Sequence, residues 1–152
     1  MTRASTWSNP DGLVVGYGRN TAHVTGAGNK DYGHAIKNAS VVFKYSDTGV
    51  NIPIPAGSHV VGVKLVVGTA WVGGTKVEVG DGSDADGFVS ATDGATANLT
   101  AGAVIGGTGL YTKGGTDTTA QEFKLYASAD TLDVTITGTY TAGDATLLVS
   151  YF

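Results

Sequence analysis

The stretch LDVTITGTYTAGDATLLVSYF, residues 132–152, decides the fold class of this chain. In its first half aliphatic residues alternate with polar ones, at Leu132, Val134 and Ile136. This period of two is typical of a strand that buries one face. Apolar residues return after the turn-forming segment Thr141-Ala142-Gly143-Asp144. We therefore predict two antiparallel strands, Leu132–Tyr140 and Ala145–Phe152, joined as a hairpin by that turn.

A longer apolar run lies upstream, at Val60–Val72. One face of this run carries four aliphatic residues: Val61, Val63, Leu65 and Val67. Its second face is half apolar as well, which predicts a central strand covered on both sides. The Gly73-Gly74 pair predicts a tight hairpin turn into a further strand, Thr75–Val79. Alternate residues of that strand are expected to face the core (Val77, Val79) or the solvent (Lys76, Glu78).

Shorter segments of the same kind complete the pattern. Ala39–Tyr45 alternates, and Gln121–Ala127 alternates through its residues Phe123 and Leu125. Asn51–Pro55 is extended, but its two prolines cannot donate to a ladder, so it belongs on an edge or in a bend. Ala95–Ala103 could form one short helical turn. Seven or eight short strands separated by turns predict an all-β fold, an antiparallel β-sandwich or jelly roll.

The composition excludes several classes of protein. The 152 residues include 24 Gly and no Cys, and 9 Lys and Arg stand against 13 Asp and Glu, for a net charge of −4. Abundant glycine argues against an all-helical bundle. The lack of cysteine excludes a disulfide scaffold, a thiolate nucleophile and a Cys-ligated metal. With so few basic residues, we expect no broad phosphate-binding surface and no nucleic-acid partner.

The chain divides near Asn38. Residues 1–38 are poor in strand patterning and rich in Gly, Asn and charge, which predicts an N-terminal arm before a β-sandwich domain at residues 39–152. Met1–Trp7 has no apolar core after its charge, so we expect no signal peptide. No apolar run approaches the roughly 20 residues of a membrane span, so we expect no membrane association, and we expect synthesis in a cytosolic compartment.

One segment resembles a metal-binding loop, at Gly80–Phe88. Its alternating aspartates before a glycine match the first half of a calcium loop, but position 93 is Asp where an EF-hand needs Glu. We therefore expect a β-turn loop without a metal. The three histidines share no metal-ligand spacing, and no nucleophile elbow is present. We predict no catalytic residues and no cofactor.

Apolar and aromatic residues are scattered through the polar arm, where no core is apparent for them. Trp and Tyr dominate binding hot spots, so these residues are candidates for partner binding. The candidates are Trp7, Leu13, Val14, Val15, Tyr17, Arg19 and Tyr32. Two other interpretations stay open: Trp7 packs back on the sandwich, or Leu13–Val15 completes a sheet as an edge strand. For Trp71 we favour packing in the core.

Three parts of the chain carry a family resemblance: Trp7–Gly18, Ile54–Val63 with Val77–Phe88, and Leu132–Tyr151. They resemble the opening, the centre and the closing hairpin of small structural proteins encoded beside the major capsid gene of tailed bacteriophages. That group is similar to capsid decoration (cement) proteins with a β-sandwich or jelly-roll fold. The resemblance implies symmetric oligomers that bridge neighbouring capsomers on the outside of the shell, and it supplies no catalytic residues. Arg19–Asn38 lies outside it.

These observations favour a non-enzymatic virion structural protein that decorates and stabilises a phage capsid. Its expected partners are the major capsid protein and further copies of itself, with a trimer favoured and a dimer as the alternative. One alternative function is a carbohydrate-binding module of a fibre or tail, which would read glycans with Trp71 and loop aromatics. A second is a hydrolytic spike domain, which would need two close carboxylates in a cleft.

Overall fold

The computed structural model describes residues 6–8, 14–16, 36–112 and 124–152. The chain falls into two compact units, Met1–Ala35 and Ile36–Phe152. In the first unit, β1 (Thr6–Ser8) and β2 (Val14–Gly16) form a two-stranded antiparallel sheet. In the second unit, β3 begins at Lys37, so the last two residues of the predicted arm belong to a strand of the sandwich.

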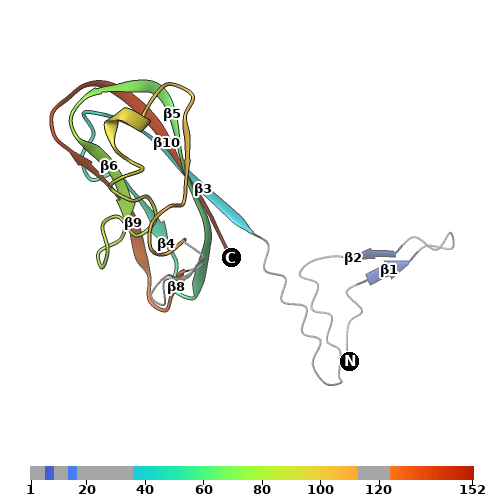
Figure 1. Cartoon of the computed structure of the whole chain (residues 1–152). Helices are drawn as coiled ribbons and strands as arrows, with labels where there is room; N and C mark the ends of the chain where they lie inside the picture. Colours follow the sequence, from blue (N-terminus) through green and yellow to red (C-terminus); the bar gives the residue numbers. More distant parts are fainter. Residues whose placement is uncertain (1–5, 9–13, 17–35, 113–123) are drawn as a thin grey trace. The chain divides into compact units, whose positions relative to one another are not determined.

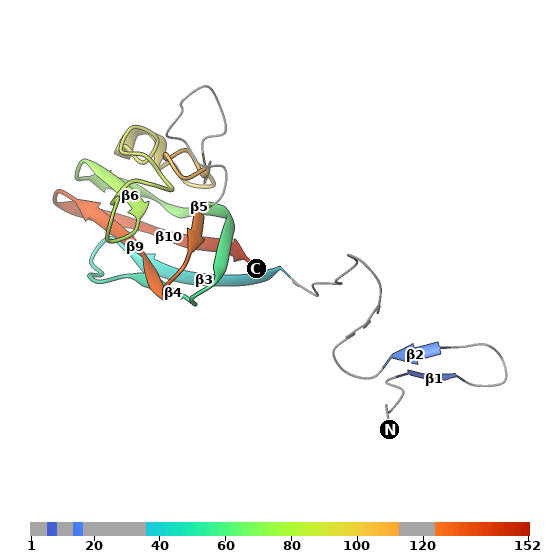
Figure 2. The same cartoon turned by 90° about the horizontal axis from the view of Figure 1, so that it is seen from below.

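The second unit consists of two antiparallel sheets packed face to face (Figures 1 and 2). The larger sheet has the order β3-β10-β5-β7, and β8 also pairs with β5. Its strands are β3 (Lys37–Lys44), β5 (Ser58–Gly73), β7 (Val104–Gly106), β8 (Lys124–Tyr126) and β10 (Tyr140–Tyr151). The smaller sheet, in the order β4-β9-β6, contains β4 (Asn51–Ile54), β6 (Lys76–Gly80) and β9 (Asp130–Thr137). The predicted all-β sandwich is confirmed.

The core lies between the two sheets and is built from one face of each strand. Val63, Leu65 and Val67 of β5 are buried against residues of the other sheet. The two sheets contribute mainly aliphatic side chains, among them Ile52, Ile54, Val77, Val79, Leu132, Leu147 and Val149. This is the period of two that the sequence shows, because successive side chains of a strand point to opposite faces.

An aromatic cluster closes one end of the core. Trp71 is buried, lies 5.9 Å from Phe43 and packs edge-on against Tyr140 at 5.0 Å between ring centroids. Its indole Nε1–H donates a hydrogen bond to the carbonyl oxygen of Asp144 at 3.3 Å. The prediction that Trp71 packs in the core is therefore confirmed.

Both hairpins predicted from the sequence are wrong. Residues 141–144 lie inside β10, and β9 does not pair with β10 but with β4 and β6. Gly73-Gly74 likewise leads from β5 in the larger sheet to β6 in the smaller one. Gly73-Gly74 therefore carries the chain from one sheet to the other, and the crossing from β9 to β10 lies at Gly138-Thr139, before the predicted turn. A short glycine turn suits such a crossing as well as a hairpin, because both need a sharp reversal with positive φ.

The long strand β5 differs from its predicted pattern at its start. A register shift lies where Tyr151 pairs with Val60 and Ser150 pairs with Gly62. The extra residue, Val61, is turned away, so Val60 is buried in place of the predicted Val61. β5 is central, as predicted, but no second layer of the described residues covers its outer face, where Lys64 is exposed.

Two further residues differ in burial from the prediction. Glu78 is buried, because the loop after β6 bridges that strand at Val79 through Val89. Leu125 is half exposed, and the next residue, Tyr126, takes the inward position. Phe123 lies outside the described residues.

The proline-containing strand and the small helical turn lie where they were predicted. β4 lies at the edge of the smaller sheet with Pro53 in it, as predicted. A single turn of 3-10 helix, η1 (Thr96–Asn98), forms within the segment that was expected to contain one. Within the described ranges, no helix has the length and apolar character needed to cross a membrane.

Candidate partner-binding surface

The outer face of the larger sheet is an open surface of the described sandwich. The pairing of β3 with β10 and of β10 with β5 aligns outward-facing residues in rows. The rows are Val42-Thr146-Val66, Ser40-Leu148-Lys64 and Asn38-Ser150-Gly62, and we call these nine residues the outer face. β7 extends the first row, because its Val104 pairs with Val66.

The outer face combines exposed aliphatic side chains with small polar ones and has little charge. Val42 is 70% exposed, Val104 59% and Leu148 40%, and Lys64 is the one charged residue among the nine. The remaining residues are small and neutral. A contiguous exposed apolar patch with small polar neighbours is typical of a protein–protein contact.

A shallow depression of about 340 Å³ lies on this face. It is lined by Asn38, Ala39, Ser40, Gly62, Lys64, Leu148, Val149 and Ser150. Gly62 leaves the space open: a Cβ there would meet only the Cβ of Ser150, at 3.8 Å. The Ser150 hydroxyl donates to Oδ1 of Asn38 at 2.7 Å. The depression can take an apolar side chain of a partner, with Lys64 beside it for a carboxylate.

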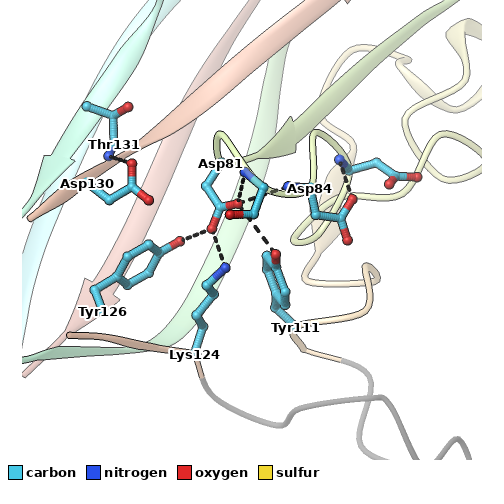
Figure 3. Close-up of polar contacts among 9 residues, drawn as sticks. Asp81, Asp84, Tyr111, Lys124, Tyr126, Asp130 and Thr131 are labelled. Atoms are coloured by element: carbon cyan, nitrogen blue, oxygen red, sulfur yellow. Dashed lines mark hydrogen bonds and ion pairs between the residues drawn. The ribbon is translucent and has the colours of Figure 1, made fainter. Parts of the chain in front are cut away.

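A second polar cluster gathers around Asp81, at the end of β6 (Figure 3). The Asp81 carboxylate accepts backbone N–H bonds from Ser83 at 2.9 Å and Asp84 at 3.0 Å. It also accepts the hydroxyl hydrogen of Tyr126 at 2.8 Å and forms an ion pair with Lys124 Nζ at 2.6 Å. Asp81 therefore closes its own turn and ties it to β8.

Tyr111 completes the cluster from a third segment. Its hydroxyl donates to Asp81 at 3.4 Å, and Lys124 Nζ lies 3.7 Å from the centre of its ring. The same ring packs edge-on against Phe88 at 5.2 Å. Residues 81–112 are thus anchored to β8 by both charge and packing.

The electrostatics of the cluster favour a charged Asp81, a charged Lys124 and a neutral Tyr126. Burial opposes ionisation of Asp81, but the bonds from Lys124, Tyr126 and the two backbone N–H groups outweigh it and hold its pKa below the ordinary value. Burial likewise disfavours the charge on Lys124, yet the ion pair with Asp81 raises its pKa. Burial and then the bond to Asp81 raise the pKa of Tyr126 strongly, so it remains a donor.

The loop predicted as a turn is a turn, built on the carboxylate of Asp81. The pKa of Asp84 is raised, first by burial and then by its neighbour Asp86. In the described part of the chain, no three His, Cys, Asp or Glu side chains are grouped as metal ligands. With five donors around it, Asp81 has a structural role and offers no open position.

Three of the candidate residues predicted in the arm lie in the small sheet. Trp7 lies in β1, and Val14 and Val15 lie in β2, where Trp7 pairs with Val15. Leu13, Tyr17, Arg19 and Tyr32 lie outside the described residues. The role of these seven residues in partner binding stays a prediction.

Sequence reasoning missed the outer face and the Asp81 cluster. One signal for the outer face was present: Val66 gives β5 a half-apolar second side. For the cluster, the segment Asp81-Gly82-Ser83-Asp84 signals a side-chain-closed turn. Nothing local connects it to Lys124, because the two residues are far apart in the chain.

Comparisons with known proteins identify the fold through solved structures. No protein-family model matches the sequence, and no curated protein matches it. One structural neighbour is a chain in the acidic stable capsid structure of Helicobacter pylori bacteriophage KHP30, with a TM-score of 0.53 and 17% identity over 77% of this chain and 86% of that one. Another belongs to the cyanophage Pam1 capsid asymmetric unit, with a TM-score of 0.53 and 17% identity over 86% of this chain and 92% of that one. Both neighbours that share this fold are chains of phage capsid structures.

Proposed function

We propose that this protein is a non-enzymatic structural component of a phage virion that binds the outside of the capsid shell and stabilises it, as a decoration or cement protein does. The observation that carries the proposal is the fold: most of this chain aligns with most of two chains found in phage capsid structures. The proposed partners are the major capsid protein and further copies of this chain. A trimer, with a dimer as the alternative, remains part of the proposal.

The surface of the sandwich supports this role. Val42, Val104 and Leu148 are exposed on the larger sheet, and they provide apolar contact area with few charges to desolvate. Shells repeat their surface many times, so a modest contact made by each subunit of an oligomer adds up through multivalency.

The burial of Trp71 argues against the glycan-binding alternative as it was expected to work. A glycan-binding module was expected to use Trp71, but Trp71 is buried between Phe43 and Tyr140 and can stack on no sugar. For the hydrolytic spike domain, the interacting carboxyls Asp84 and Asp86 lie on the loop after β6. The depression on the outer face contains neither of them.

Particles with and without this protein test the proposal. Shells assembled without it are mixed with purified protein, and binding is measured by co-sedimentation and electron microscopy. We expect regularly spaced added density on the outer surface and a higher temperature of shell disruption. Density inside the shell or at the tail, or no binding, would contradict the proposal.

Two variants then separate the contact surfaces. Deletion of residues 2–20 removes the arm's apolar anchors, and we expect loss of shell binding with an unchanged melting temperature of the sandwich. Leu148→Glu places a charge on the outer face and leaves the core unchanged, because Leu148 is half exposed. If the deletion lowers the melting temperature strongly, the arm is part of the folded core and not a docking segment.

A further inference from the structure

Strand edges differ sharply in how they are protected in the described sandwich. β4 has four residues and contains Pro53, which cannot donate a ladder hydrogen bond. The edge of β6 is covered, because Val79 bridges Val89 and Lys76 bridges Ala95. β7 has only three residues. Short strands, prolines and covering loops are the usual ways of preventing edge-to-edge pairing.

β3 is the exception. It has eight residues, pairs with β10 along its whole length without a register shift, and has no second partner among the described strands. Its sequence, KNASVVFK, has no proline, and its charges stand only at the two ends. Two exposed aliphatic residues lie along it: Val42, and Ile36 just before its start, which is 62% exposed. A long regular edge of this kind is a template for pairing with another strand.

The hydrogen-bond phase of β3 shows which backbone groups are open. The N–H of Tyr45 donates to the carbonyl of Gly143 at 3.0 Å, so odd-numbered residues bond to β10 and even-numbered ones point off the sheet. The N–H of Lys44 points off the sheet but is already bonded to the Asp47 carboxylate at 2.9 Å. Three positions of the strand then have no backbone partner among the described residues on this edge: Asn38, Ser40 and Val42.

We propose that this edge binds a second copy of the same chain, with the two β3 strands antiparallel about a twofold axis at Ser40. The open positions are symmetric about Ser40, so each of them gains a partner: Ser40 lies opposite Ser40 of the second copy, and Asn38 lies opposite its Val42. A register centred on Val41 would place Asn38 opposite Lys44, whose N–H is already bonded to Asp47. The two larger sheets then form one continuous sheet across the pair of copies.

The side chains of β3 are complementary to themselves in this register. Lys44 lies opposite Ile36 of the second copy, and Lys37 lies opposite its Phe43, so no lysine faces a lysine directly. Like charges directly opposite each other would destabilise the pair. A twofold contact joins copies in pairs, either as a dimer or between neighbouring oligomers. This proposal does not depend on the proposed binding to a shell.

A single engineered cysteine tests the contact, because the chain has no cysteine of its own. Residues directly opposite in a hydrogen-bonded antiparallel pair have Cα atoms about 5.5 Å apart, within the range of a disulfide. The full-length Ser40→Cys variant should form a disulfide-linked pair of chains under mild oxidation. The matched control is Val104→Cys, an exposed position on the opposite edge of the same sheet. If the Ser40→Cys variant links no faster than this control, the proposal is wrong.

A second measurement needs no cross-link. Val42→Lys adds a charge to the free edge, and Val104→Lys adds the same charge on the far edge. Sedimentation of the full-length proteins is measured over a series of rising concentrations. We expect the first variant to form smaller species than the unaltered chain at each concentration, and the second variant to behave as the unaltered chain does. Equal behaviour of the two variants would overturn the proposal.

Discussion

Gly74 and Gly138 lie against each other where the chain crosses twice between the two sheets. A Cβ atom on Gly138 would lie 2.9 Å from the Cα of Gly74, and the Gly74 N–H donates to the carbonyl of Thr139 at 2.8 Å. Their φ angles are +57° and +97°, in the region that favours glycine. The two crossings therefore support each other, and neither position has room for a side chain.

Gly138→Ala is expected to destabilise the sandwich by about 2 kcal/mol or more, because it combines a positive φ with a close backbone contact. The measurement is urea denaturation followed by circular dichroism. Gly82→Ala is the matched control, since a Cβ there meets nothing within 4 Å and its φ is not positive; it should change stability by less than roughly 0.5 kcal/mol. Equal effects would show that the crossing tolerates a side chain.

Asp81→Asn is expected to cost about 3 kcal/mol, because it leaves the largely buried Lys124 ammonium without its counter-charge. The amide oxygen can still accept from the turn, so the loss reports on the ion pair. Glu78→Gln breaks the ion pair with Lys76, whose side chain is more exposed, and should cost about 1 kcal/mol or less. Thermal unfolding compares the two variants, and a smaller effect at Asp81 than at Glu78 would contradict this assignment.

Acid should remove the contribution of Asp81. Its pKa is lower in the folded protein than the roughly 3.9 of an unfolded chain, so its stabilising effect is present above that value. The effect is lost as the pH falls through the lower, folded pKa. Denaturation midpoints should therefore converge for the unaltered protein and Asp81→Asn below about pH 4. A gap between them that stays constant to low pH would disprove the linkage.

Calcium is not expected to bind the Asp81–Asp86 loop. Lys124 Nζ, 2.6 Å from the Asp81 carboxylate, already occupies the position that a cation would take. Isothermal titration calorimetry of the full chain with calcium should show no saturable heat at micromolar concentration. A saturable heat that disappears in Asp81→Asn would establish a metal site there.

Several structural features were predictable from short stretches of sequence. The alternation of Val63, Leu65 and Val67 marks a strand with one buried face, and the structure buries all three. Pro53 predicts an edge strand, because an imide nitrogen cannot donate to a ladder wherever the strand sits. The Asp-Gly-rich segment after Gly80 predicts a turn for an equally local reason, since a carboxylate can close on nearby N–H groups.

The sequence by itself therefore determined most of the strand segments and most of their alternation, because these properties depend on contacts between near neighbours in the chain. It misplaced one turn, since residues 141–144 lie inside β10. Only the tertiary structure decided which strands pair. Gly73-Gly74 is a reversal as predicted, but it leads from one sheet to the other instead of closing a hairpin, and the second crossing lies at Gly138, inside a segment predicted as strand. The same holds for Asp81 and Lys124: their pairing depends on packing β8 against β5, which no local pattern records.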